Sequence, residues 1–352
     1  MITLNSDIFY VGLGCFIVSF VICKLMVLVN LSDSPNYRSI HNKTNPTGGG
    51  LGIIAALGFS LILINTFIPE VSLSKDLPYF LVCAIMISFL GVLDDIFEIR
   101  AIHKFTIIIF ISIVAVILIG PATSLPGFYS SINLPYLVGL TGSALWIFVC
   151  INGINFMDGA NGLMASFMFL ATFSLSIIAF ISGAVTTMII GLTLCFGLLG
   201  LLPFNFGNNS KIFAGDTGSL LTGFIFSFSA LLLVKETDNH DLLYVGPLLI
   251  LPFLSDIFIT MLGRVRLRGS FFSAHKDHLY QVLIAQNVSH TRVSIAYLAT
   301  GMFISSLTIF CVIKEIRISM WILLISITTA ASVRYFIKRD IVLKQKGKSR
   351  KA

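Results

Sequence analysis

Acidic residues stand beside long apolar runs at three places in this chain: Asp94 with Asp95, Asp158, and Asp216. Lipid cannot satisfy such groups, so they must face protein, water or a ligand. Carboxylate and amide oxygens are the hard ligands that Mg²⁺ prefers, and amides also recognise nucleobases and sugars. These residue types therefore indicate a site for a cation and a polar ligand within an apolar protein.

The densest of these places is the segment 152–162, which holds three Asn, one Asp and three Gly. Glycine lets the backbone approach a ligand closely or adopt a positive φ. A polar turn between two membrane helices, with Asp158 or Asn161 as an N-cap, would produce the same pattern. The other polar segments favour the ligand-binding interpretation.

Asp94 and Asp95 directly follow an apolar run, so they fall at the predicted C-terminal end of a helix. Two adjacent carboxylates repel each other there and also face the negative end of the helix dipole. A cation or a proton between them would remove this cost. The alternative is an ordinary solvated loop, in which Glu98 and Arg100 are their neighbours.

Asp216 and Thr217 stand between Gly215 and Gly218, just before another apolar run. Flanking glycines leave the carboxylate on backbone that a ligand can approach closely. Phe213 precedes them and could stack on a ring. Alternatively, Asp216 or Thr217 caps the next helix, and Phe213 is an aromatic residue of the membrane interface.

A basic segment that includes Lys43 precedes the glycine run Gly48, Gly49 and Gly50, which opens a predicted helix. Free backbone N–H groups at a helix start make a natural anion site. The alternative is a positively charged cytoplasmic loop followed by a glycine-rich packing face.

A second basic cluster contains Arg264, His275, Lys276 and His278. No third zinc ligand is adjacent to the two His residues, so the cluster suits a phosphate chain better than zinc. Asp256 lies inside the preceding span. It is a functional candidate by default, whereas pairing with an Arg at a helix end would make it structural.

The composition sets the class: 56% of the 352 residues are hydrophobic and only 11% are charged. Soluble domains carry about 25% charged residues, so we predict an all-α polytopic membrane protein. The six cysteines stand singly in apolar runs and are interpreted as buried hydrophobic residues. At roughly 17–25 residues per span, the chain contains about eleven transmembrane helices. They are expected near 8–30, 48–69, 78–93, 105–120, 135–151, 163–182, 184–203, 217–234, 242–262, 293–313 and 318–336.

Most of the 23 basic residues fall in alternate interhelical segments and in the C-terminal tail. This asymmetry predicts that these segments are cytoplasmic, with the N-terminus outside and the C-terminus inside. We therefore predict one transmembrane catalytic domain over 1–337 and a basic cytoplasmic tail over 338–352. Its cytoplasmic active-site loops are predicted at 31–47, 94–104, 152–162, 204–216 and 263–292.

Carboxylates, amides, a glycine run and a basic cluster at one membrane face suit phosphoryl transfer from a Mg²⁺-bound polyphosphate to a lipid. At this point the chain resembles the polyprenyl-phosphate N-acetylhexosamine-1-phosphate transferases. The resemblance is carried by Asn45-Pro46-Thr47-Gly48-Gly49, Gly91-Val92-Leu93-Asp94-Asp95, Asn155-Phe156-Met157-Asp158-Gly159-Ala160-Asn161-Gly162 and Phe213-Ala214-Gly215-Asp216-Thr217-Gly218-Ser219.

The resemblance implies that undecaprenyl phosphate attacks a UDP-N-acetylhexosamine to give a lipid diphosphate sugar and UMP. It implies the catalytic residues Asp94, Asp95 and Asp216, and Mg²⁺, or Mn²⁺ in its place, on Asp216 and Asp158. On the substrate side it implies Asp158, Asn155, Asn161, Asn205, Phe213, Lys43 and His41. The basic cluster of Arg264, His275, Lys276 and His278 joins them as predicted phosphate-binding residues.

Within the family, the segment 274–281 is similar to the branch that transfers GlcNAc, FucNAc or QuiNAc to begin an O-antigen. Asn161 stands where the translocase branch has Asp, which argues against a phospho-MurNAc-pentapeptide transferase. The implied location is the bacterial cytoplasmic membrane, with the active site on the cytoplasmic face and no nucleic-acid partner. A homodimer stays open. From a different class, a cation-coupled secondary transporter stays as the alternative.

Overall fold

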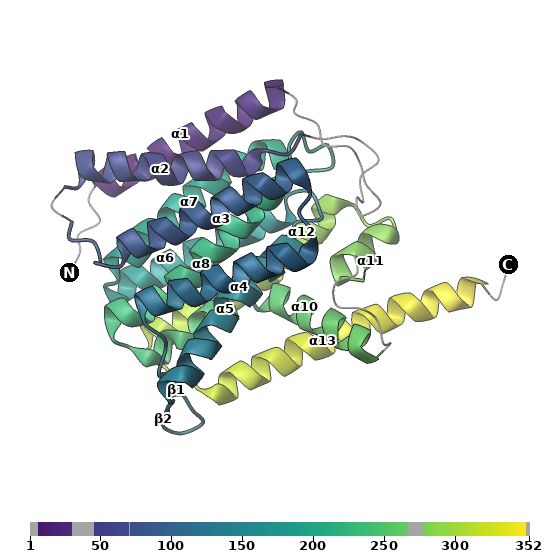
Figure 1. The fold of residues 1–352 in the computed structure, drawn as a ribbon. Helices are drawn as coiled ribbons and strands as arrows, with labels where there is room; N and C mark the ends of the chain where they lie inside the picture. Colours follow the sequence, from purple (N-terminus) through teal and green to yellow (C-terminus); the bar gives the residue numbers. More distant parts are fainter. Residues whose placement is uncertain (1–5, 30–45, 70, 267–276, 350–352) are drawn as a thin grey trace.

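The computed structural model describes residues 6–29, 46–69, 71–266 and 277–349, and these form a helical bundle with one short β-hairpin (Figure 1). The elements are α1 (Ser6–Val29), α2 (Gly49–Phe67), α3 (Leu77–Phe97), α4 (Ala101–Ile119), β1 (Ser124–Pro126), β2 (Ser131–Asn133), α5 (Tyr136–Phe156), α6 (Leu163–Ser182), α7 (Val185–Asn205), α8 (Gly215–Thr237), η1 (His240–Tyr244), α9 (Val245–Leu249), α10 (Leu251–Arg266), α11 (Leu279–Ala285), α12 (His290–Ile313) and α13 (Met320–Ser349).

Within the described residues, nine helices are long and apolar enough to cross a membrane: α1 to α8 and α12. The predicted span at 242–262 is instead a broken one, because His240–Leu249 and Leu251–Arg264 meet at an angle of 71°. The last predicted span corresponds to a shorter apolar part of α13, Ile322–Arg334. The prediction of an all-α polytopic membrane protein is confirmed, whereas the count of eleven spans stays a prediction.

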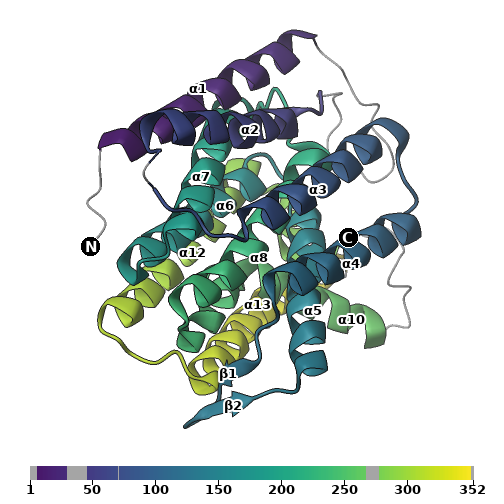
Figure 2. The same ribbon diagram turned by 60° about the vertical axis from the view of Figure 1, so that its left-hand side comes forward.

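Helix α8 lies at the centre of the bundle and packs against α2, α3, α5 and α7 (Figure 2). Every residue from Thr217 to Val234 is buried. Small residues allow this close packing: a Cβ at Gly50 would lie 2.3 Å from the Gly218 nitrogen, and a Cβ at Gly91 would lie 2.5 Å from the Thr217 Cα. The ends of α2 and α3 therefore meet the N-terminus of α8 directly.

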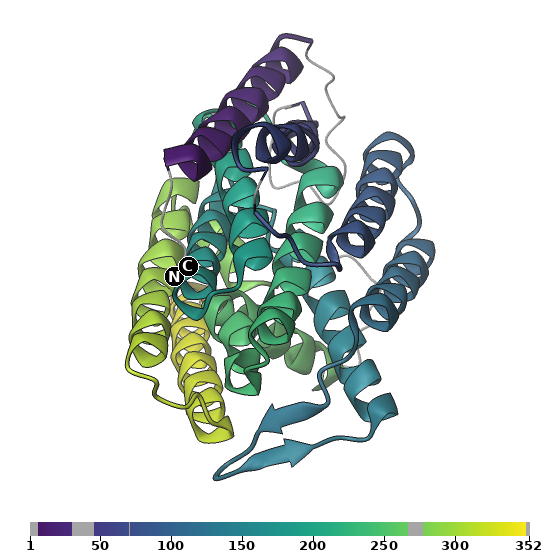
Figure 3. The same ribbon diagram turned by 90° about the vertical axis from the view of Figure 1, so that its left-hand side faces the viewer.

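The β-hairpin joins α4 to α5 at the end of the bundle where α1 begins, as Figures 1 and 3 show. Strand β1 pairs with β2 antiparallel, with Leu125 opposite Ile132. Helix α11 and the C-terminal end of α13 lie at the opposite end, at the right in Figure 1. We call these the hairpin end and the site end.

Several predicted loops are partly helical. Helix α3 continues to Phe97 and α5 to Phe156, α8 begins at Gly215, and α13 continues to Ser349. The helices continue past the apolar runs, and the polar residues Asp94, Asn155 and Asp216 in these additional turns have partners on other helices. The chemistry therefore sits on helix ends, which hold side chains more rigidly than loops do.

Candidate active site

The centre of the site is Lys104, which lies in the first turn of α4 and bridges two carboxylates. Its Nζ lies 2.5 Å from Oδ2 of Asp94, near the end of α3, and 2.8 Å from Oδ2 of Asp216, at the start of α8. The Asp94 side chain is only 5% exposed, whereas that of Asp216 is 32% exposed. Asp216 is therefore the carboxylate of this cluster that a ligand can reach.

Asn155, in the last turn of α5, holds Asp216 from the other side. Its Nδ2 donates to Oδ1 of Asp216 and, over 2.8 Å, to Oγ of Ser219. Asn155 and Lys104 together fix both carboxyl oxygens of Asp216, because each oxygen has a different donor. The structure thus brings together predicted residues from three separate sequence segments.

Asp95 caps helix α8. Its Oδ1 accepts the backbone N–H of Asp216 over 2.8 Å, and its Oδ2 accepts the Thr217 N–H over 3.0 Å and the Thr217 hydroxyl over 2.6 Å. These N–H groups have no intrahelical acceptor, so a carboxylate from α3 takes the place of a local N-cap. Asp95 and Asp94 are neighbours in sequence but have different partners.

We expect the Asp95→Asn substitution to lower the free energy of unfolding by about 1–2 kcal/mol, the usual cost of losing a helix cap. An amide cannot accept at both positions, so its NH₂ group would face either the backbone N–H of Asp216 or the donors of Thr217. Thermal unfolding in detergent measures this effect. Asp241→Asn, which changes a more exposed ion pair with Arg317, should leave the melting temperature closer to that of the wild type. An unchanged melting temperature for Asp95→Asn would contradict the capping role.

Asp158 lies just beyond α5, in the short connection to α6. Burial raises its pKa well above the usual range, and the nearby charges of Asp216 and Asp95 raise it further. The carboxylates thus crowd one another, with the Lys104 ammonium set between Asp94 and Asp216. A divalent cation would relieve this repulsion.

The Gly49 and Gly50 N–H groups at the start of α2 are not free for an anion, which corrects the predicted anion site. The Gly49 nitrogen donates to the Phe213 carbonyl and the Gly50 nitrogen to the Ala214 carbonyl, both over 2.9 Å. Thr47 forms an isolated parallel bridge with Phe213. The packing interpretation is the correct one, because the run holds the segment before α8 in place.

Asn205 and Asn161 shape the connection between α5 and α6. Oδ1 of Asn205 accepts the Gly162 N–H over 3.0 Å, and its Nδ2 donates to the Ile212 carbonyl over 2.9 Å. Asn161 is 3% exposed, and its Nδ2 donates to the Gly207 carbonyl over 2.8 Å. Both amides bind backbone here and so have a structural role, and their predicted contacts with a ligand stay predictions.

The basic cluster is only partly described. His41, Lys43, His275 and Lys276 lie outside the described residues. His278 is 3% exposed and faces Asp256 through Nδ1 over 3.2 Å, so the predicted contact of His278 with a phosphate chain is not supported. Arg264 is buried near the end of α10. The pairing of Asp256 with Arg334 of α13 makes Asp256 structural.

Lys104 was missed as a site residue by sequence reasoning, which placed it among the cytoplasmic basic residues. One signal was available: a lysine in the first turn of a helix opposes the helix dipole. Such a lysine needs acidic partners, and the pair Asp94 and Asp95 stands one short segment earlier.

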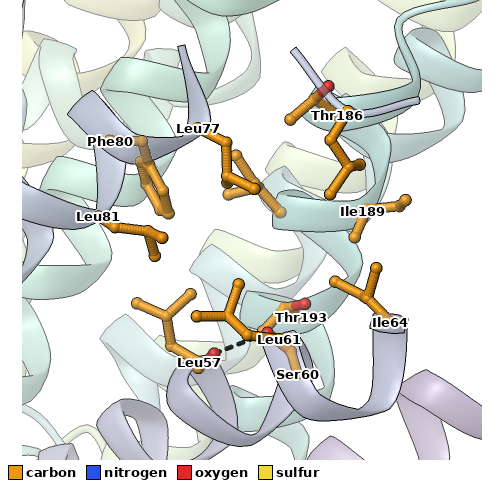
Figure 4. Close-up of a pocket in the computed structure, with 12 residues that line it drawn as sticks. Leu57, Ser60, Leu61, Ile64, Leu77, Phe80, Leu81, Thr186, Ile189 and Thr193 are labelled. Atoms are coloured by element: carbon orange, nitrogen blue, oxygen red, sulfur yellow. Dashed lines mark hydrogen bonds between the residues drawn. The ribbon is translucent and has the colours of Figure 1, made fainter. Parts of the chain in front are cut away.

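Figure 4 shows an apolar pocket away from this cluster, between α2, α3 and α7. Leu77 and Phe80 in the first turn of α3 line it, together with Thr186 near the start of α7. Asp94 is at the other end of α3. The pocket is therefore separate from the candidate active site.

Comparison with known proteins agrees with this geometry. The family model of glycosyl transferase family 4 matches residues 77–234. These residues contain Asp94, Asp95, Lys104, Asn155 and Asp216. Over these residues the chain is similar to this family.

Similarity to curated proteins extends over most of the chain. It is 27% identical over 296 residues to an undecaprenyl-phosphate alpha-N-acetylglucosaminyl 1-phosphate transferase of Yersinia pestis, covering 81% of this chain and 78% of the relative. The protein of the same name from Escherichia coli K12 is 27% identical, covering 81% and 77%. A probable undecaprenyl-phosphate N-acetylglucosaminyl 1-phosphate transferase of Bacillus subtilis is 27% identical, covering 90% and 87%.

Proposed function

We propose that this protein transfers an N-acetylhexosamine 1-phosphate from a UDP-sugar to undecaprenyl phosphate. The observation that carries the proposal is the cluster of Asp94, Lys104 and Asp216 on converging helix ends of a membrane bundle. The names of the relatives supply the lipid acceptor and the class of group transferred.

In the proposed reaction, a phosphate oxygen of the lipid forms a bond to the β-phosphorus of the UDP-sugar. The bond from that phosphorus to the oxygen bridging it to the α-phosphorus breaks, and UMP leaves with the electron pair. Lys104 neutralises phosphate charge, because it is a cation held at a helix end by Asp94. Asn155 orients Asp216 toward the substrate.

The side chains present fit Mg²⁺, with Mn²⁺ as a substitute. Within the described residues, no three acidic, His or Cys side chains converge on one metal position. Mg²⁺ is usually held by one or two carboxylates together with waters and substrate phosphates, and Asp216 and Asp158 would supply such carboxylates. When bound, the ion stabilises negative charge on the transferring phosphate.

The finer assignments are part of the same proposal. The relatives named above are GlcNAc-1-phosphate transferases, so UDP-GlcNAc is the first donor to test, followed by donors of the FucNAc and QuiNAc types. The proposed role is the first membrane step of O-antigen or another envelope polysaccharide. The distribution of basic residues supports an active site on the cytoplasmic face of the inner membrane.

The test is UMP release by the purified protein in detergent, with undecaprenyl phosphate and Mg²⁺, across a panel of UDP-N-acetylhexosamines. We expect release that needs the lipid, the metal ion and one preferred sugar. Folded protein that releases no UMP with any donor and binds no UDP would overturn the proposal and favour the transporter alternative.

A further inference from the structure

Tyr280 of α11 lies directly behind the segment that carries Asp158. It is 1% exposed, and its hydroxyl donates to the backbone carbonyl of Phe156 over 3.0 Å. The contact with the next turn is equally close, since a Cβ at Gly159 would lie 2.1 Å from the Tyr280 hydroxyl oxygen. Tyr280 therefore limits where the residues on either side of Asp158 can lie.

The hydroxyl of Tyr280 stays protonated, so it acts as a hydrogen-bond donor. Burial raises its pKa well above the usual range, and the charges of Asp256 and Asp158 raise it further. A donor is what the Phe156 carbonyl requires, because the last carbonyls of a helix have no intrahelical partner.

A buried network holds Tyr280 in place. Asp256 of α10 accepts from His278 Nδ1 over 3.2 Å and from the Leu279 backbone N–H over 3.1 Å, so it binds the start of α11. It also accepts the Tyr297 hydroxyl of α12 over 2.6 Å and forms an ion pair with Arg334 of α13. Through this one carboxylate, α10 is joined to α11, α12 and α13.

The charge of Asp256 is compensated within this network. The Arg334 guanidinium donates to the Ser255 carbonyl over 3.1 Å and to the Thr260 hydroxyl over 2.6 Å while it pairs with Asp256. Removing one partner of such a buried pair leaves an uncompensated charge, which is strongly destabilising. The hydrogen bonds and ion pairs described for Asp256 do not include Asp94, Lys104 or Asp216.

We propose that Tyr280 is a positioning residue for the donor-nucleotide side of the active site, and that Asp256, with His278, Tyr297 and Arg334, fixes Tyr280 behind the Asp158 segment. This inference rests on the proposed function, in which the Asp158 segment contacts the UDP-sugar. According to this inference, the segment 278–280 contributes to binding of the UDP-sugar, although its side chains do not contact the substrate directly.

The Tyr280→Phe variant removes the hydroxyl and keeps the ring, so the fold should be preserved, which thermal unfolding checks. We expect the KM for the UDP-sugar and the Kd for UDP to rise about fivefold, the usual effect of losing one such hydrogen bond. The KM for undecaprenyl phosphate should stay within about twofold, because the contact lies on the donor side. Tyr244→Phe is the matched control, since Tyr244 is a buried tyrosine near the hairpin end.

A second pair of variants tests the contact itself. Gly159→Ala should weaken UDP binding about tenfold or more, because the new Cβ would overlap the Tyr280 hydroxyl. Adding Tyr280→Phe should restore part of this affinity, since the nearest remaining ring atom lies 3.0 Å from the Cβ. Tyr297→Phe removes the hydroxyl that donates to Asp256. It should therefore also raise the KM for the UDP-sugar.

Independent, multiplicative effects of Gly159→Ala and Tyr280→Phe would overturn the inference. A Tyr280→Phe enzyme with the wild-type KM for the UDP-sugar would also overturn the inference. If the wild-type enzyme is active in the same assay, the proposed function is not affected by that result. Wild-type protein that neither binds UDP nor releases UMP would overturn both.

Discussion

The Asp216→Asn variant should lose its Mg²⁺-dependent UMP release by about 10²–10³-fold or more, which is the effect of removing a group that stabilises charge in a transition state. Asn has the shape of Asp but no charge, and its NH₂ group would face a donor on either Lys104 or Asn155. Asp216 is also the more exposed carboxylate of the cluster, so the loss should appear in the reaction rather than only in folding. Initial rates over a Mg²⁺ series measure this effect.

Asp241→Asn is a matched control for Asp216→Asn. Asp241 pairs with the Arg317 guanidinium over 3.0 Å near the hairpin end, far from the chemistry. Its substitution should leave the rate near that of the wild type. A folded Asp216→Asn protein with wild-type turnover and the same Mg²⁺ dependence would remove Asp216 from the proposed metal site.

The Lys104→Met variant should lower kcat by about 10²-fold or more. Met keeps the length of the side chain but removes the ammonium from between Asp94 and Asp216, so their mutual repulsion also increases. Lys104→Arg keeps the charge and should retain more activity than Lys104→Met. The rate of each variant, measured at saturating UDP-sugar, checks this order.

Lys235→Met separates chemistry from folding in this comparison. Lys235 also lies in a transmembrane helix and bonds Asp76 over 2.8 Å, at the opposite end of α8 from Asp216. It should affect stability without a comparable loss of kcat. Lys104→Met and Lys104→Arg proteins with equal, wild-type rates would contradict the role of Lys104 in neutralising phosphate charge.

Composition and periodicity alone predicted the class and the positions of most helices. Apolar runs of membrane length have few alternatives to a helix, because lipid requires every backbone group to be satisfied within the segment. The acidic residues were also recognisable from the sequence, because a carboxylate beside an apolar run needs a partner. Asp94, Asp158 and Asp216 come from three segments, and the helix packing brings them to one end of the bundle.

The division of labour between neighbouring residues was decided only by the tertiary structure. Asp94 and Asp95 are chemically identical, but the helical turn directs Asp94 toward Lys104 and Asp95 toward the N-terminus of α8. No sequence pattern predicts an N-cap that is supplied by a residue of another helix, as Asp95 of α3 does for α8.

The same holds for the basic residues and the glycines. His278 was predicted from its residue type to belong to a phosphate-binding cluster. In the structure it is buried and contacts the carboxylate of Asp256 on α10. Gly49 and Gly50 match an anion site by pattern, but the carbonyls before α8 occupy their N–H groups. Residue types determine which bonds a group can make, and long-range packing decides which partner is within reach.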